Sequence, residues 1–166
     1  MIEIHVPEVD ELSEQLGLLI GKEIKADSHE EPWEFGPSVQ SAIYVTRDDR
    51  LAAILRMDLP LAAHVGAALA MMPASASEEA AKEGVLEDDL LDAFGEVVNI
   101  MAALLCLDGA PHVRLATVNH CEPSLEADFM SALVEPEVRI NLALEVEGYG
   151  SGRMTWQTRR IAEVED

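Results

Sequence analysis

The chain has 166 residues, enough to bury a core without disulfides or a metal, and its 11 basic and 32 acidic residues give a formal net charge of −21. Such a charge repels phosphate backbones and anionic lipid surfaces, so nucleic-acid binding is disfavoured. The longest mostly apolar runs, 61–72 and 97–107, are shorter than the roughly 18 residues that a membrane span needs, so membrane insertion is not expected.

The cysteines and histidines bear on compartment and cofactors. The N-terminal residues do not read as a secretion signal, and Cys106 and Cys121 are too few for a disulfide framework. We therefore expect a cytoplasmic protein with reduced thiols. The five histidines are scattered over different elements without the spacing of metal ligands, so we predict no metal or cofactor of the protein's own.

The first half of the chain predicts a helix, a loop, a strand pair and a second helix. Apolar residues recur at helical spacing over 7–24, and 26–39 is predicted to be a loop in which Trp33 and Phe35 anchor the chain to the core. Strands are predicted over 40–47 and 50–58, joined by a tight turn at Asp48 and Asp49. Asp58 then starts a helix that Pro73 ends after residue 72.

The second half predicts a long helix followed by strands. The Ala/Ser/Glu-rich span 74–86 is typical of a linker or a frayed helix, and the most apolar helix runs over 87–107. Strands follow at 112–120, 137–147 and 153–161, the last two forming a hairpin around the glycine-rich turn 148–152. The alternation in 137–147 leaves one face of the sheet polar. This order of elements predicts an α+β fold with an antiparallel sheet.

A degenerate internal duplication is suggested by the order of elements, with halves at about 1–75 and 86–162 of a single domain spanning 1–166. Three residues of the helix predicted over 7–24 have the same spacing as three residues of the helix predicted over 87–107. These two sets are Asp10, Glu14 and Gly17, and Asp92, Glu96 and Asn99.

The polar line on the long helix is its most specific feature. Asp92, Glu96, Asn99 and Ala103 stand at i, i+4, i+7 and i+11, opposite the broad apolar stripe. Asparagine inside a helix is roughly 0.5 kcal/mol less favourable than alanine, because its amide competes for backbone hydrogen bonds. The line is therefore either a plain solvated face or a site, and a requirement other than helix stability would explain Asn99.

The pattern Asp92-x-x-x-Glu96-x-x-Asn99, followed after 23 intervening residues by Pro123, resembles the signature of the CheC, CheX and FliY phosphatases of bacterial chemotaxis, CheX-like proteins above all. The resemblance implies a CheC-like fold with two degenerate helix/β-hairpin repeats. It also implies an antiparallel sheet packed on helices that carry an exposed ExxN motif. Where that family usually has small residues after the Asn, this chain has Ile100, and Pro123 is displaced by about one residue.

The resemblance also implies a function. In that family the Glu and Asn enter the active site of a phosphorylated receiver domain of a response regulator, so Glu96 and Asn99 would be catalytic. Asn99 would orient the water that attacks the aspartyl phosphate, and Glu96 would pair with the receiver's lysine. Asp92 and Pro123 would belong to the partner-binding surface. The Mg²⁺ of the reaction would be supplied by the receiver, so the protein needs no cofactor of its own.

Two other functions remain open at the level of sequence. A non-catalytic adaptor of the same fold, binding a receiver or a motor-switch protein, would use the same face. A structural or small-molecule-binding domain unrelated to signalling would instead require Glu96 and Asn99 to be buried or capped. A second copy of the chain, as a homodimer, is a further candidate partner.

Overall fold

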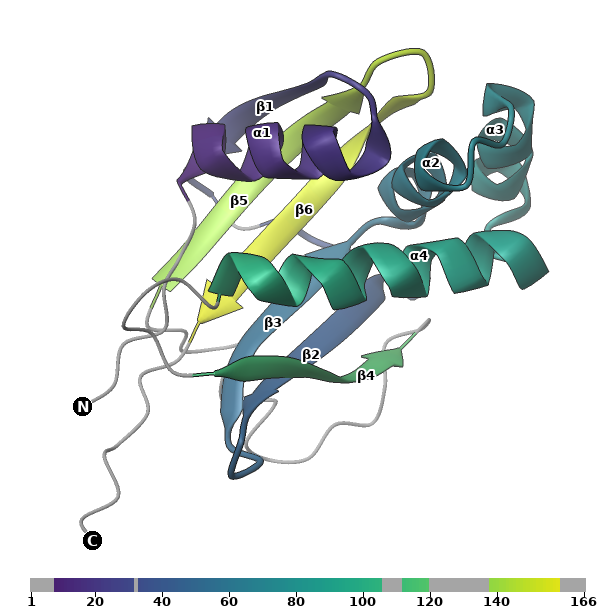
Figure 1. The fold of residues 1–166 in the computed structure, drawn as a ribbon. Helices are drawn as coiled ribbons and strands as arrows, with labels where there is room; N and C mark the ends of the chain where they lie inside the picture. Colours follow the sequence, from purple (N-terminus) through teal and green to yellow (C-terminus); the bar gives the residue numbers. More distant parts are fainter. Residues whose placement is uncertain (1–7, 32, 106–111, 120–137, 159–166) are drawn as a thin grey trace, which may run out of the picture.

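The computed structural model describes residues 8–31, 33–105, 112–119 and 138–158. These residues form two layers, an antiparallel sheet and a set of helices (Figure 1). The six strands follow the order β1-β5-β6-β3-β2-β4 across the sheet. Their bounds are β1 Ile24–His29, β2 Gln40–Thr46, β3 Leu51–Met57, β4 Val113–Asn119, β5 Val138–Val146 and β6 Gly150–Thr158.

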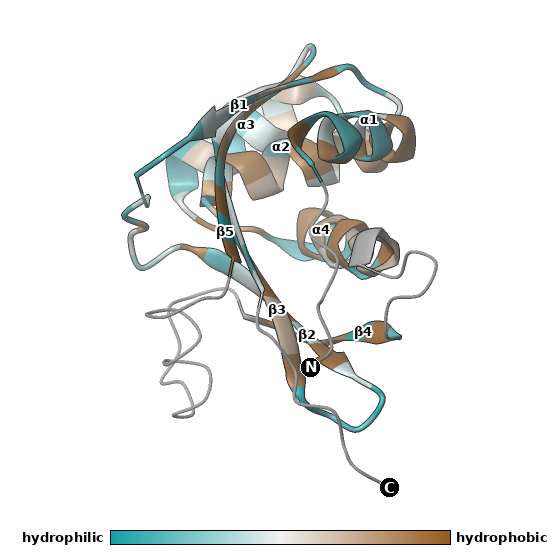
Figure 2. Ribbon diagram, turned by 90° about the vertical axis from the view of Figure 1, so that its left-hand side faces the viewer, coloured by the Kyte–Doolittle hydropathy of each residue, from teal (hydrophilic) through white to brown (hydrophobic). Residues whose placement is uncertain are grey.

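The helices pack on one face of the sheet, and Figure 2 shows α1, α2 and α4 together beside the sheet viewed nearly edge-on. The helix bounds are α1 Val9–Ile20, α2 Leu59–Leu69, α3 Ala74–Glu83 and α4 Asp88–Met101, which continues as the 3₁₀ turn η1 Ala102–Leu105. α2 is the centre of this layer, because it packs against α1, α3, α4 and β6. Its residues from Leu61 to Ala68 are all buried.

The strand order has an internal symmetry. If β1, β2 and β3 are exchanged with β4, β5 and β6, the order β1-β5-β6-β3-β2-β4 reads the same from the opposite edge. β1 pairs with β5 of the other half, and β4 pairs with β2 in the equivalent way. This topology supports the proposal of two helix/β-hairpin repeats.

One predicted loop contains a strand. The sequence indicated a loop over 26–39, but Ile24–His29 forms β1, an edge strand paired with β5. Its side chains are largely exposed, so they lack the apolar alternation that predicts a strand. α1 accordingly ends at Gly21, whose left-handed φ of 70° caps the helix, rather than at residue 24.

Trp33 and Phe35 anchor the following segment, but to the outer face of the sheet. The indole N–H of Trp33 donates to the Leu142 carbonyl at 3.2 Å, and Arg153 lies 4.7 Å from the centre of its ring. Arg56 lies 4.9 Å from the centre of the Phe35 ring. Two of the chain's few cations are therefore held on the side of the sheet away from the helices.

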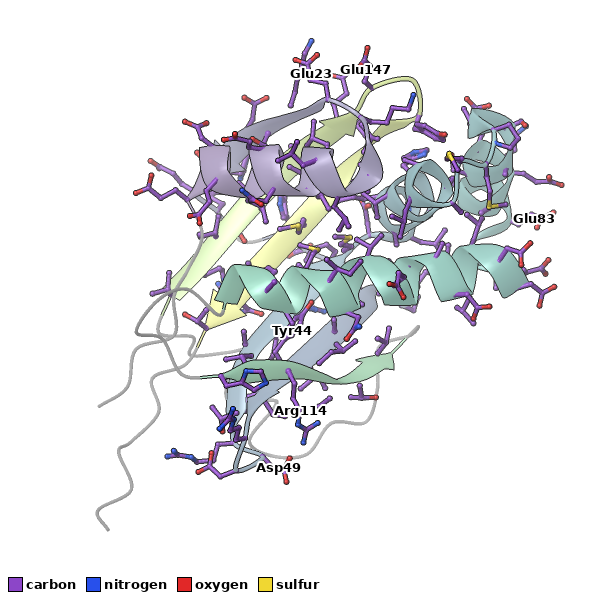
Figure 3. The ribbon with its side chains drawn as sticks, viewed as in Figure 1. Glu23, Tyr44, Asp49, Glu83, Arg114 and Glu147 are labelled. Carbon is purple, nitrogen blue, oxygen red and sulfur yellow. The ribbon has the colours of Figure 1, made fainter. Side chains whose placement is uncertain are left out.

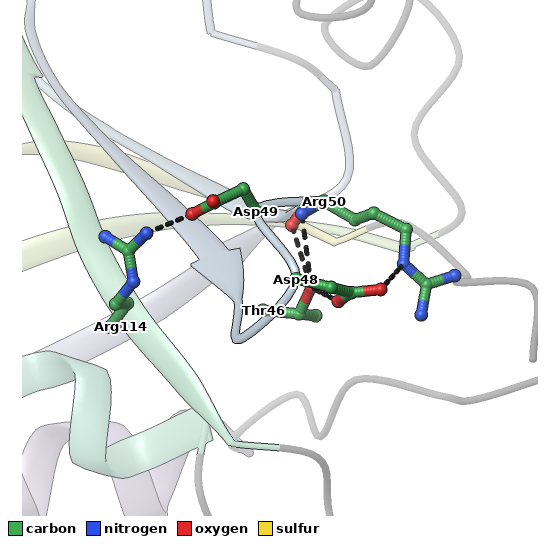
Figure 4. Close-up of polar contacts among 5 residues, drawn as sticks. All are labelled: Thr46, Asp48, Asp49, Arg50 and Arg114. Atoms are coloured by element: carbon green, nitrogen blue, oxygen red, sulfur yellow. Dashed lines mark hydrogen bonds and ion pairs between the residues drawn. The ribbon is translucent and has the colours of Figure 1, made fainter. Parts of the chain in front are cut away.

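The turn between β2 and β3 lies where the sequence predicted it. The Thr46 N–H donates to the Arg50 carbonyl at 2.9 Å, and Asp49 adopts a left-handed φ of 60°. Asp49 pairs with Arg114 of β4, and Asp48 pairs with Arg50 (Figure 4). The hydrogen bond from the Thr46 hydroxyl is the main cause that lowers the pKa of Asp48.

Two corrections concern the helices after β3. α2 ends at Leu69, before the predicted residue 72, and Ala74–Glu83, where the sequence allowed a linker or a frayed helix, is a formed helix. Asp58 caps α2 as predicted, accepting from the Leu61 N–H at 3.0 Å. Its second oxygen accepts from the Arg153 N–H at 3.0 Å, which fastens the start of α2 to β6.

Candidate functional site

The helix α4 forms and packs because of its apolar stripe. Five of its side chains are buried against α2 and the sheet, namely Leu90, Phe94, Val97, Val98 and Met101. Their i, i+3/i+4 and i+7 spacing places them on one face, so burial of this stripe determines which way the opposite stripe points. Acidic residues in its first turn, Asp88 and Asp89, suit the positive end of the helix dipole.

The opposite stripe is open to solvent. Asp92, Glu96 and Asn99 are all exposed, and Ala103 beyond them is exposed as well. Glu96 and Asn99 are three residues apart, which places their side chains next to each other on the helix surface. The predicted exposure of both is confirmed, and no described segment covers them.

A tyrosine that the sequence analysis did not single out holds the end of α4. Tyr44, from β2, lies between the sheet and α4 (Figure 3). Its buried hydroxyl donates to the Val98 carbonyl at 2.6 Å. The Ala102 N–H donates to the Asn99 and Ile100 carbonyls as the chain tightens into η1. Tyr44 thus fastens the backbone of α4 to β2 immediately before Asn99.

The environment of Tyr44 keeps its hydroxyl a hydrogen-bond donor. The ring is fully buried and stacks on Trp156, with ring centres 5.7 Å apart. Burial raises the pKa of the phenol, so it stays protonated. The one signal in the sequence is a tyrosine at an inward position of a buried strand, since a buried hydroxyl needs a partner.

A close crossing with α2 sets the position of the middle of α4. A Cβ atom built on Gly66 would lie 3.3 Å from the Leu90 oxygen and 3.3 Å from the Phe94 nitrogen. The two helix backbones approach this closely only because residue 66 has no side chain. Gly66 and Tyr44 therefore position the two ends of the segment that carries Glu96 and Asn99.

The equivalent stripe of α1 cannot carry the same group. Asp10 and Glu14 are exposed like Asp92 and Glu96, but Gly17 stands where α4 has Asn99. A Cβ on Gly17 would lie 2.9 Å from the Lys22 backbone oxygen, because the chain turns back against the helix here. An asparagine would collide with that turn, so only α4 offers the carboxylate and carboxamide together.

The chemistry available on α4 is positioning and charge. A carboxylate accepts hydrogen bonds and pairs with cations, whereas a carboxamide both donates and accepts and can orient a water molecule. Within the described ranges, no three or more His, Cys, Asp or Glu side chains are grouped so as to hold a metal ion. None of the described helices is long and apolar enough to cross a membrane.

Three residues named from the sequence fall outside the described ranges. They are Pro123, predicted to be part of the partner-binding surface, and Cys106 and Cys121.

Comparison with known proteins identifies the fold. Neither a protein-family profile nor a curated protein matches the chain by sequence. Among solved structures, the FliM middle domain from H. pylori matches with a TM-score of 0.59 at 11% identity, over 91% of this chain and 84% of that one. FliY from Thermotoga maritima matches with a TM-score of 0.54 at 16% identity, over 89% and 81%.

A third structure includes a partner. CheX from Borrelia burgdorferi, solved in a complex with CheY, BeF₃ and Mg²⁺, matches with a TM-score of 0.50 at 10% identity, over 93% of this chain and 100% of that one. The chain therefore has the fold of CheX, FliY and the FliM middle domain, which confirms the fold predicted from the ExxN pattern. At these identities the likeness is one of fold.

Proposed function

We propose that this protein is a CheX-like phosphatase that hydrolyses the aspartyl phosphate of a response-regulator receiver domain. The observation that carries the proposal is the exposed pair Glu96 and Asn99, adjacent on the open face of α4. The fold adds support, since CheX of the same fold was solved with CheY and BeF₃. The partner proposed here is a phosphorylated receiver.

In this mechanism Asn99 enters the receiver's active site and holds a water molecule in line with the acyl phosphate. The water oxygen bonds to phosphorus, the bond from phosphorus to the aspartyl oxygen breaks, and the products are inorganic phosphate and the free aspartate. Because an acyl phosphate is already activated, positioning and charge stabilisation suffice and the phosphatase needs no nucleophile. Glu96 pairs with a lysine of the receiver, and the receiver brings its own Mg²⁺.

The test is phosphate release from purified receiver domains of the same genome, charged with acetyl phosphate, using the parent and Asn99→Ala. We expect the variant to lower the rate by about a hundredfold, the effect of removing one preorganised group from a transition state. The dissociation constant for the beryllofluoride-charged receiver should stay within a few-fold. Glu79→Ala, an exposed side chain on α3, is the control and should change neither quantity.

Stability distinguishes a catalytic from a structural asparagine. Since Asn99 is exposed, Asn99→Ala should leave thermal unfolding unchanged or slightly improved. A loss of about 2 kcal/mol or more would make Asn99 structural. If Asn99→Ala hydrolyses the receiver's aspartyl phosphate as fast as the parent does, the proposal that this protein is a phosphatase is wrong.

The likeness to FliM and FliY favours a second candidate, a non-catalytic adaptor that binds a receiver or a motor-switch protein through the same face. The adaptor would bind its partner without accelerating the loss of phosphate. The same phosphate-release assay therefore separates the two.

A further inference from the structure

A groove opens between α1 and α4 beside Asn99. It has a volume of about 290 Å³, and its walls include Leu18 and Leu19 of α1, Ile100 of α4 and Ala103 of η1. Leu18 is 72% exposed and Ile100 is 38% exposed, two of the few large apolar side chains that the described surface presents. Ile100 directly follows Asn99, so the groove is continuous with the candidate site.

The charged side chains of the two helices that flank the groove have one sign. Every charged residue of α1 and α4 is acidic: Asp10, Glu11, Glu14, Asp88, Asp89, Asp92 and Glu96. The nearest lysine, Lys22, follows α1 and lies beside Leu18 in a separate hollow. A second copy of this chain docked through the same helices would place like charges against each other, which is unfavourable. A partner with an apolar side chain ringed by lysine or arginine is complementary to this surface.

We propose that Leu18 and Ile100 form an apolar seat that takes an exposed aliphatic or aromatic side chain on the cationic surface of the receiver, next to its phosphorylation site. This inference rests on the proposed function and deepens it. Asn99 acts at the phosphate and Glu96 pairs with the lysine, two groups that receivers share. The seat contacts a neighbouring side chain that differs among receivers, so this contact selects the partner.

The position of Ile100 gives the seat its geometry. A residue one position after Asn99 is rotated by about 100° around the helix, so its side chain leaves the line of Glu96 and Asn99 and turns toward α1. Leu18 meets it from the opposite wall of the groove. A receiver side chain inserted here would be held by both helices at once, and burial of such a central apolar contact contributes strongly to interface affinity.

The test measures binding of beryllofluoride-charged receiver domains of the same genome to the parent, Leu18→Ser and Ile100→Ser. Each substitution should weaken binding of the cognate receiver about tenfold, which corresponds to about 1.4 kcal/mol. In phosphate release the loss should appear mainly in KM rather than in kcat. Circular dichroism and thermal unfolding check that both variants fold, as expected for exposed positions.

Two matched controls lie away from the seat. Met71→Ser pairs with Leu18→Ser, because Met71 is 89% exposed, and Val85→Ser pairs with Ile100→Ser, because Val85 is a β-branched residue that is 44% exposed. Val85 precedes the opposite end of α4, about 20 Å from Ile100 by the rise of the helix. Neither control should change receiver binding.

The outcomes separate the seat from the phosphatase activity. Unchanged receiver binding by both seat variants, with phosphate release by the parent intact, overturns the seat and leaves the function standing. Binding that depends on Leu18 and Ile100 without any phosphate release supports the seat and replaces the enzyme with an adaptor. Self-association of the parent in sedimentation that Leu18→Ser abolishes would assign the groove to a second copy and overturn the receiver seat. Absence of binding to every receiver overturns both.

Discussion

Tyr44 connects the sheet to the candidate site, because its hydroxyl on β2 is hydrogen-bonded to the backbone of α4 next to Asn99. Its hydrogen bond to the Val98 carbonyl is buried, so Tyr44→Phe would remove a hydrogen bond at a place where water cannot replace it. We expect a loss of about 1–3 kcal/mol in the free energy of unfolding, measured by urea denaturation. Tyr149→Phe is the control, because the Tyr149 hydroxyl donates to the Met72 carbonyl at a half-buried position where water can replace it. An equal or smaller effect at Tyr44 would contradict this account.

A buried histidine makes stability depend on pH. His64 lies 2.9 Å from the Ser77 hydroxyl through Nδ1, and because Ser77 itself donates to the Ala74 carbonyl, Nδ1 carries the proton. Its Nε2 faces Gly150, where a Cβ would lie 2.6 Å away. Burial lowers the pKa of His64 despite the opposing charges of Asp58 and Glu78.

The sign of the pH effect follows from this lowered pKa. The unfolded chain, with a histidine pKa of about 6.5, binds the proton before the folded protein does. The contribution of neutral His64 to the free energy of unfolding is therefore fully present above about pH 6.5 and is lost as the pH drops below that value. Urea unfolding between pH 7.5 and 5.5 should show the decline in the parent and a weaker one in His64→Gln. Parallel curves for the two proteins would exclude His64 as the cause.

At the scale of elements, the sequence predicted those with strong patterns and missed those without. Eight helices and strands were predicted because apolar residues recur along them with a period near 3.6 or 2. β1 was missed because its exposed side chains give no alternation, and it depends on pairing with β5, more than 100 residues away. The sequence did not distinguish a linker from a frayed helix at α3, because this helix buries little, mainly Ser77 and Ala80.

The candidate site was predictable only in its surface part. Glu96 and Asn99 could be placed on the exposed stripe of α4 because the apolar stripe opposite is unambiguous. The contacts of Tyr44 and Gly66 with α4 join segments distant in sequence, so no local pattern reports them. Leu18 could not be paired with Ile100 without the packing of α1 beside α4.

Two glycines on packed helices should respond oppositely to the same substitution. Gly95→Ala, in α4, introduces a Cβ that meets nothing within 4 Å, so it should stabilise the protein by about 0.8–1 kcal/mol. Gly66→Ala in α2 pushes against backbone atoms of α4, which do not yield as a flexible side chain would, and should destabilise by about 1 kcal/mol. Thermal and urea unfolding of both variants measure this. A gain at Gly66 equal to that at Gly95 would disprove the close crossing.

At the scale of the molecule, charge is divided between the two layers. Across the described helices the one basic residue is Lys82 of α3, whereas Arg56 and Arg153 lie on the far side of the sheet. A cationic partner is therefore attracted to the helical face from a distance.

Association with the charged receiver should weaken as salt rises, by about tenfold between low and high ionic strength, because salt screens exposed charges. Stopped-flow association rates measure the effect. Asp92→Asn, on the helical face, should make the salt dependence shallower. Asp27→Asn, an exposed residue of edge strand β1, should leave it unchanged. Equal slopes for the two variants would show that net charge, rather than its placement, governs association.

The exchange of strands between the two halves means that neither half is a self-sufficient folding unit. Among the described strands, β1 pairs with β5 alone and β4 pairs with β2 alone, while β3 and β6 join the halves along the middle of the sheet. A chain severed near Gly84 would yield two fragments, each with a strand that lacks its partner and an apolar surface uncovered. The two fragments should reassemble when mixed, because each carries the strand that pairs with the unpaired edge strand of the other.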